Sequence, residues 1–193
     1  MKIFKYILPI ASIFFFGACD TNDDGFYNRV YVDVENLVTI ETQPSYSVDD
    51  ILWVDAYIPR LLQEDGQTEL VDIRQTTGNA TAFQFSFVLE RSNGGNWEPV
   101  DVTGDFVEDE GDGLAGSFVE AEAQFNNDLD AYIFRGGIQL SQAGEYRLSY
   151  GYNSSSVDVV ELISNSTNNN IFVNIYSQTN QVNDEGYYVF TVN

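Results

Sequence analysis

The chain has 193 residues, with 30 Asp or Glu against 8 Lys or Arg, so its formal net charge is −22 at pH 7. Nucleic-acid binding relies on Lys and Arg that neutralise phosphates, so this composition argues against a nucleic-acid partner. The sequence contains no histidine, which excludes serine–histidine triads, cysteine–histidine dyads, histidine zinc sites and the commonest general base.

The first residues have the pattern of a secretory signal. Lys2 and Lys5 give a positive start, residues 6–16 form an apolar run, and small residues follow at Gly17 and Ala18. A transmembrane helix needs about 20 apolar residues, so this run is too short to span a bilayer. A positive start, a short apolar region and a small-residue cleavage site are typical of a signal peptide that is removed.

Residues 16–19, with the sequence FGAC, resemble the lipobox of bacterial lipoproteins, although Phe16 stands in place of the usual leucine. This resemblance implies that Cys19 is acylated and becomes the new N-terminus. The alternative is an ordinary signal peptide followed by an incidental cysteine. Cys19 is the only cysteine, so an internal disulfide is excluded.

The acidic run at residues 20–25 resembles the export signal of Bacteroidota surface lipoproteins, and a solvated tether is the simpler interpretation of the same residues. We expect a lipoprotein signal peptide over 1–18, an acidic tether over 19–28 and a single domain over 29–193. The resemblance implies lipid anchoring to the bacterial outer membrane, at the cell surface.

From residue 30 onward the hydrophobic pattern predicts β-strands. Val30, Val32 and Val34 alternate with polar residues, as in a strand with one buried face. Residues 51–58 are apolar on both faces, which favours a central strand, and Pro59 ends it.

The clearest strand covers residues 82–90, where Phe83, Phe85, Phe87 and Leu89 point to one side. The polar, glycine-containing segment that follows predicts a turn and a hairpin with residues 97–102. Proline lacks a backbone donor, so Pro99 predicts that this second strand lies at an edge.

Residues 104–116 are acidic and rich in glycine, and we expect a loop there. The remaining strands are expected at residues 118–125, 132–140, 146–150, 157–163, 171–176 and 187–192. About ten short strands without a convincing long helix favour an all-β fold, an antiparallel β-sandwich.

Two segments resemble the tyrosine corner before strand F of immunoglobulin-like domains. One contains Gly144 and Tyr146, and the other contains Asp184, Gly186 and Tyr188. The resemblance implies that each tyrosine hydroxyl bonds back to nearby backbone. We favour one enlarged immunoglobulin-like sandwich, and two small sandwiches split near residues 104–113 are the alternative.

Catalysis without histidine would need a pair of carboxylates, as in glycoside hydrolysis. With 30 acidic residues some close pair is expected by chance, so a pair of carboxylates alone is no evidence for catalysis. We therefore expect no enzyme. A calcium site is the one cofactor considered, because the acidic loop gathers oxygen ligands that calcium prefers. A solvated acidic loop is the alternative to a calcium site formed by Asp105, Glu108, Asp109, Glu110 and Asp112.

Aromatic side chains are the third kind of candidate site. Trp97, Tyr150 and Tyr152 are candidates for ligand binding by stacking, and packing in the core is the alternative for each of them. Trp53 lies between Leu52 and Val54, and we expect it in the core.

The signal, the tether and the two corners together resemble small Bacteroidota outer-membrane lipoproteins with an immunoglobulin-like sandwich. The resemblance implies a non-catalytic, lipid-anchored binding or adhesion protein of the cell envelope that captures glycan or protein. The alternative function is an envelope scaffold or an accessory subunit of an outer-membrane protein complex.

Overall fold

A computed structural model describes residues 28–151, 156–165 and 171–193. The described part is all-β, with fifteen strands and one helix of four residues, so the all-β prediction is confirmed. The estimate of about ten strands is wrong, because it missed strands of three to five residues that are too short to show an alternating pattern. No helix in these three ranges is long and apolar enough to cross a membrane.

The first half of the chain contributes β1 (Asn28–Glu35), β2 (Val38–Ile40), β3 (Ile51–Pro59), β4 (Leu61–Gln63), β5 (Leu70–Asp72), α1 (Ile73–Thr76), β6 (Ala82–Asn93) and β7 (Asn96–Pro99). The second half contributes β8 (Phe106–Glu110), β9 (Asp112–Ala115), β10 (Val119–Asn126), β11 (Ala131–Gln139), β12 (Gly144–Ser149), β13 (Val159–Asn165), β14 (Ile171–Gln178) and β15 (Tyr188–Val192).

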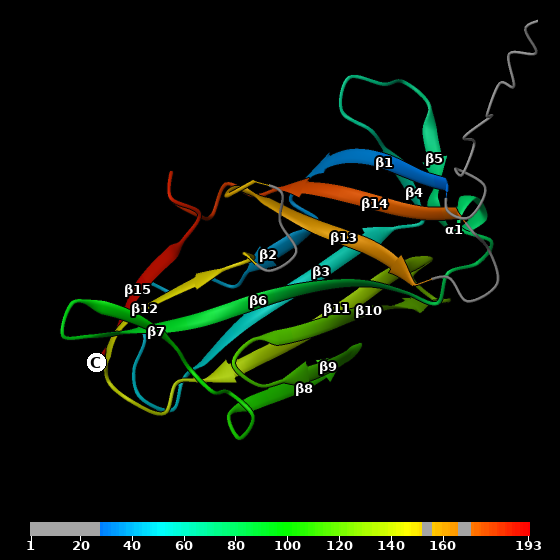
Figure 1. Cartoon of the computed structure of the whole chain (residues 1–193). Coiled ribbons are helices and arrows are strands. Elements are labelled where there is room, and N and C mark those ends of the chain that lie inside the picture. Colours follow the sequence, from blue (N-terminus) through cyan, green and yellow to red (C-terminus); the bar gives the residue numbers. More distant parts are fainter. Residues whose placement is uncertain (1–27, 152–155, 166–170) are drawn as a thin grey trace, which may run out of the picture.

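Thirteen strands form one sheet, and its main path runs β1-β14-β13-β6-β10-β11-β3-β2, while β4 and β5 form a separate hairpin. The long strand β6 joins two parts of this sheet (Figure 1). Its first half pairs with β10 and β13, and its second half pairs with β12 and β7. Most pairs are antiparallel, but β1 and β14 run parallel, which the sequence pattern did not predict.

The sheet curls until β2, at one end of its main path, approaches β14 and the residues that follow β14. The backbone N–H of Leu37, just before β2, donates to Ser177 Oγ at 2.9 Å. Ile40 N–H donates to Gln181 Oε1 and the Gln181 amide donates back to the Ile40 carbonyl, both at 2.7 Å. These bonds satisfy polar groups at the β2 edge, and the curled sheet encloses one hydrophobic core.

The predicted inward face of β6 is confirmed. Phe83, Phe85 and Phe87 are all fully buried, and the Phe85 ring meets the Phe134 ring edge-on with centroids 5.4 Å apart. Burying each phenylalanine contributes roughly 1.5–3 kcal/mol relative to exposure. This row of rings therefore makes β6 the main strand of the core.

Residues 104–116 are not the loop that the composition predicts. They contain β8 and β9, which are joined at Gly111 but pair with different neighbours: β8 with β11, and β9 with β10. Gly111 has a φ of +80°, and a Cβ there would stand 2.6 Å from the Glu122 carbonyl oxygen. Glycine is required at this point because no side chain fits.

One of the two predicted tyrosine corners has the expected hydrogen bond. Tyr146 donates its hydroxyl to the Gln142 carbonyl at 2.8 Å, four residues back along the chain. Tyr188 instead has its hydroxyl 3.3 Å from the hydroxyl of Tyr46, a residue distant in sequence. The local backbone bond expected for Tyr188 is therefore replaced by a contact between side chains.

Trp53 lies on the outer face of β3, so its predicted place in the core is wrong. Its half-buried ring lies over Gly137 of β11, where a Cβ would stand 2.8 Å from the indole Cε3. The guanidinium carbon of Arg135 is 4.4 Å from the ring centroid, and Arg135 also pairs with Glu41 at 2.8 Å. The flanking residues of Trp53 face the core instead.

Candidate functional site: a polar cleft at the end of the β6–β7 hairpin

The hairpin that joins β6 and β7 positions the site. Gly94 and Gly95 form its two-residue turn with φ angles of +59° and +91°. Two positive φ values are typical of the type I′ turn that fits the twist of two antiparallel strands. The strand β7 pairs only with β6 among the described residues, which confirms the edge position predicted from Pro99.

The inner face of this hairpin continues the core face of β6 but becomes polar. Leu89 is buried, and Arg91, two residues further, points to the same side beyond the end of the core. The register places Arg91 opposite Glu98 of β7 on one side and Tyr146 of β12 on the other. Three neighbouring strands therefore present polar groups to the same space.

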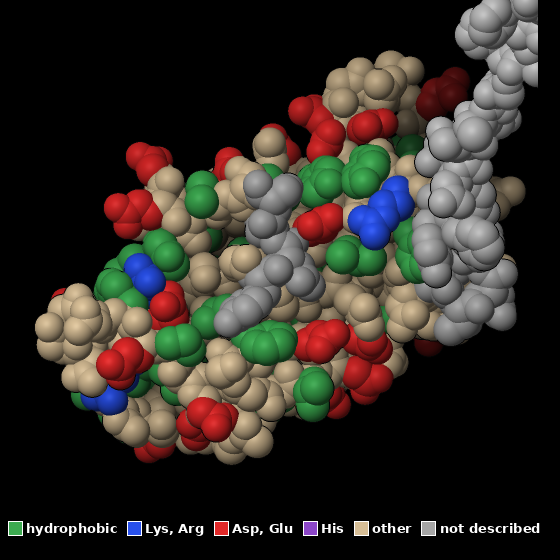
Figure 2. Space-filling view, viewed as in Figure 1, with side chains coloured by type: hydrophobic (Ala, Val, Ile, Leu, Met, Phe, Trp, Pro, Cys, Tyr) green, Lys and Arg blue, Asp and Glu red, His purple; other side chains and the backbone are tan. Residues whose placement is uncertain are grey.

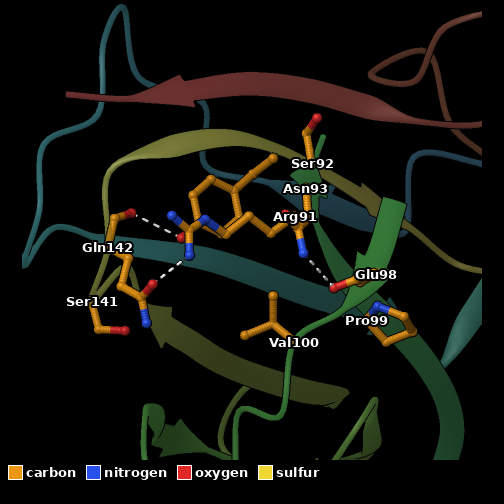
Figure 3. A pocket seen from close by; sticks show the side chains of 9 residues that line it. Arg91, Ser92, Asn93, Glu98, Pro99, Val100, Ser141 and Gln142 are labelled. Carbon is orange, nitrogen blue, oxygen red and sulfur yellow. Dashed lines mark hydrogen bonds between the residues drawn. The ribbon is translucent and has the colours of Figure 1, made fainter. Parts of the chain in front are cut away.

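This space is a cleft of about 320 Å³, and nine residues line it: Arg91, Ser92, Asn93, Glu98, Pro99, Val100, Ser141, Gln142 and Tyr146. Figure 3 shows the Arg91 side chain reaching toward Gln142 on one side, with Asn93 and Glu98 on the other and Val100 between them. This volume lies at the lower end of the range that is typical of small-molecule sites.

Hydrogen bonds hold both sides of the cleft. The Arg91 guanidinium donates to Gln142 Oε1 and, at 2.8 Å, to the Ala143 carbonyl. Asn93 donates its amide to Glu98 Oε2 at 3.2 Å. These bonds orient the polar groups before any ligand arrives, which lowers the entropic cost of binding.

The turn before β12 fits closely around Arg91. Gly144 has a φ of +153°, and a Cβ at this position would stand 3.0 Å from Arg91 Nε. The Tyr146 hydroxyl also stabilises this turn, because it donates a hydrogen bond to the Gln142 carbonyl. Burial raises the pKa of Tyr146, and the positive charge of Arg91 partly opposes that rise. Tyr146 therefore stays a neutral hydrogen-bond donor at physiological pH.

The opposite face of the same strands carries Trp97, a candidate for ligand binding by stacking, and its side chain is half-buried. The Arg147 guanidinium lies between two rings, with its carbon 4.6 Å from the Trp97 centroid and 3.7 Å from the Tyr187 centroid. Arg147 Nε also donates to Glu90 Oε2 at 2.6 Å. Arg147 therefore occupies one face of the Trp97 ring, which is then not available for stacking against a ligand.

The other predicted aromatic residues do not join this site. Tyr150 is only 4 % exposed, which corrects the expectation that its ring contacts a ligand. Burial raises its pKa, and its hydroxyl has no hydrogen-bond partner among the described residues. Tyr152 and Cys19 lie outside the described residues, so both predictions stay untested.

Three of the five acidic residues proposed for calcium have separate partners. Asp105 accepts a hydrogen bond from Ser141 and Glu108 accepts one from the Gly113 backbone, while Asp109 pairs with Arg135. Glu110 and Asp112 lie in β8 and β9 on either side of Gly111. Within ranges 28–151, 156–165 and 171–193, no three acidic or cysteine side chains gather as a metal site. The geometry gives the calcium prediction no support.

This cleft was not predicted from the sequence, although one feature of the sequence points to it. Alternation from Phe83 to Leu89 places Arg91 on the inward face of β6 if the strand continues beyond residue 90. A charged residue that continues an apolar face indicates the open end of a core. Ser141 and Gln142 carry no such signal, because they reach the cleft from a connection distant in sequence.

On the face that Figure 2 shows, acidic side chains are scattered over the surface, and the few basic side chains lie apart from one another. Comparison with known proteins finds no matching family model, no matching curated protein and no matching solved structure.

Proposed function

We propose that this protein is a non-catalytic, lipid-anchored binding protein of the bacterial cell envelope. It holds a polar ligand, a glycan or a polar segment of a protein, in the cleft beside Arg91. The observation that carries this proposal is the cleft itself, which gathers hydrogen-bonding groups from β6, β7 and the 141–142 turn. Binding sites built on strands are more precisely positioned than sites built on loops.

The position of the cleft supports a role at the surface. Asn28, the first described residue, begins β1 beside Ile171, near the start of β6 at Ala82. Arg91 lies nine residues further along β6, roughly 30 Å away at the usual rise of a strand. A lipid at Cys19 would therefore hold the molecule by one end and present the cleft at the other.

The immunoglobulin-like sandwich belongs to the same proposal. The hydrogen bond from Tyr146 to the Gln142 carbonyl supports it. The parallel pairing of β1 with β14 is a departure from the purely antiparallel arrangement expected.

A second candidate function, an envelope scaffold or accessory subunit, has its own supporting observation. The eight-residue strand β1 pairs with β14 only, among the described residues. Its free edge accepts one hydrogen bond, from Asp65 N–H to the Asp33 carbonyl at 3.0 Å. Free strand edges can pair with a strand of another protein.

Glycan and matrix-protein arrays with the purified full-length protein would test the cleft. Ser141 is exposed at the cleft, and Ser141→Tyr places a large ring there. Thr68→Tyr adds the same ring near the β4–β5 hairpin, where Thr68 is exposed. We expect Ser141→Tyr to lose the array signal and Thr68→Tyr to keep it. Equal binding by both variants would remove the cleft from the proposal, and pull-downs with β1-edge variants would then test the scaffold.

A further inference from the structure

Arg91 differs from the three arginines that form ion pairs in the described part of this acidic protein. Arg60 pairs with Asp72 at 2.7 Å, Arg135 with Glu41 at 2.8 Å, and Arg147 with Glu90 at 2.6 Å. Arg91 is held by neutral oxygens instead, and no carboxylate of the described residues forms an ion pair with it. Its positive charge is thus positioned but not neutralised.

The guanidinium also keeps free donors. It has five N–H groups, and the Gln142 side chain and the Ala143 carbonyl accept one from each terminal nitrogen. Nε is buried beside Gly144 without a partner. Each terminal nitrogen therefore has a second hydrogen that no contact among the described residues uses. A carboxylate is the acceptor that best matches a guanidinium in charge and planar geometry.

The other side of the cleft favours hydroxyl groups. Glu98 and Asn93 supply a carboxylate and an amide, which accept from and donate to hydroxyls. The strong negative charge of the whole molecule does not exclude an acidic ligand, because charges beyond about 8 Å are screened at physiological salt. Glu98 is the only carboxylate that lines the cleft as described.

The geometry points to a saccharide that carries a carboxylate, a uronate, as the ligand of this cleft. Its carboxylate binds the free hydrogens of Arg91, and its ring hydroxyls bind Glu98 and Asn93. This inference rests on the proposed binding function and specifies the chemical class of the ligand.

Calorimetric titration of the full-length protein at 0.15 M salt with trigalacturonate and with its methyl ester tests this inference. The ester has the same sugar backbone without the charge. Because charge-assisted hydrogen bonds are the strong ones, we expect the acid to bind about tenfold or more tightly than the ester. Equal affinity for the two probes would overturn the inference.

Four variants test which residue of the cleft causes the preference for the acid. Arg91→Gln should reduce the affinity for the acid to that for the ester, and Arg91→Lys, which keeps the charge without the planar fork, should restore part of the preference. Arg29→Gln removes the same charge from an exposed position on β1 and should bind like the unmodified protein. Glu98→Gln should weaken acid and ester by a similar factor, because it acts on the hydroxyls. An acid preference that survives Arg91→Gln would overturn the assignment to Arg91.

The outcomes separate this inference from the proposed function. If the ester binds as well as the acid and Ser141→Tyr abolishes both, the cleft binds saccharide but does not select a carboxylate. If neither probe binds, the uronate inference is wrong, and the arrays decide independently whether the cleft binds anything else.

Discussion

Tyr132 shows at the scale of a single residue how a polar group is accommodated in the core. Its side chain is fully buried, and its hydroxyl donates to the Ala80 carbonyl at 3.0 Å. Burial raises the pKa of Tyr132 to about 12 from an ordinary value near 10. The neutral phenol is therefore strongly favoured in the folded state.

This arrangement predicts a change of stability with pH. The raised pKa means that the contribution of Tyr132 is complete below pH 10 and is lost as the pH rises from 10 to about 12. Tyr132→Phe leaves the buried Ala80 carbonyl without its partner, so we expect it to lower the free energy of unfolding by about 1–3 kcal/mol at pH 7.

Tyr132→Phe has no phenol to ionise at this position. The difference in the free energy of unfolding between this variant and the unmodified protein should therefore shrink by about 1 kcal/mol at pH 11. Urea denaturation of both proteins at pH 7 and pH 11 measures this difference. A difference that stays constant or grows at pH 11 would contradict the assigned pKa.

The consecutive strands β8 and β9 show what glycine does at the scale of an element. The Phe106 ring of β8 fits between Gly113 of β9 and Gly136 of β11, where a Cβ on Gly113 would stand 2.5 Å from the ring and one on Gly136 would stand 3.0 Å from it. The pairing of β8 with β11 shifts its register between Arg135 and Gly136, at the start of the paired glycines.

We expect Gly136→Ala to lower the free energy of unfolding by about 1–3 kcal/mol, because its methyl group would overlap the Phe134 ring and press on Phe106. Gly104→Ala is the matched control, since a Cβ there meets no atom within 4 Å and should change stability by less than about 0.5 kcal/mol. Chemical denaturation of the three proteins makes the comparison. Equal stability of both variants would mean that the ring does not need the space at Gly136.

At the scale of the whole molecule, the start of β1 and the β6–β7 hairpin lie at opposite ends of the long strand β6 (Figure 1). Cys19→Ala removes the only residue that a lipid could modify in the proposed way. We expect this variant to move from the membrane fraction to the soluble fraction of the cell envelope, as measured by fractionation and immunoblotting. Retention of the variant in the membrane fraction would refute lipid anchoring through Cys19.

Protease treatment of intact cells tests on which side of the outer membrane the anchored protein lies. Digestion of the anchored protein without lysis is expected if the cleft faces outward from the cell surface. Survival of the protein until lysis, beside a surface control that is digested, would place it in the periplasm and favour the scaffold function.

Much of the fold could be predicted from the sequence, because alternation between apolar and polar residues is a local property of a strand. Phe83, Phe85 and Phe87 define the inward face of β6 in this way, and Pro99 correctly indicates an edge. The Tyr146 hydrogen bond was likewise predictable, since its partner lies only four residues away.

Burial and site assembly were decided by the tertiary structure. Alternation separates two faces of a strand but does not say how far each is covered, so Trp53 was wrongly expected in the core, and for Tyr150 a ligand site and the core both stayed open. Arg91 and Glu98 meet through the local β6–β7 hairpin, but Gln142 joins them only because the distant strand β12 pairs with the second half of β6. Such long-range pairing depends on the packing of the whole core, and no local pattern in the sequence records it.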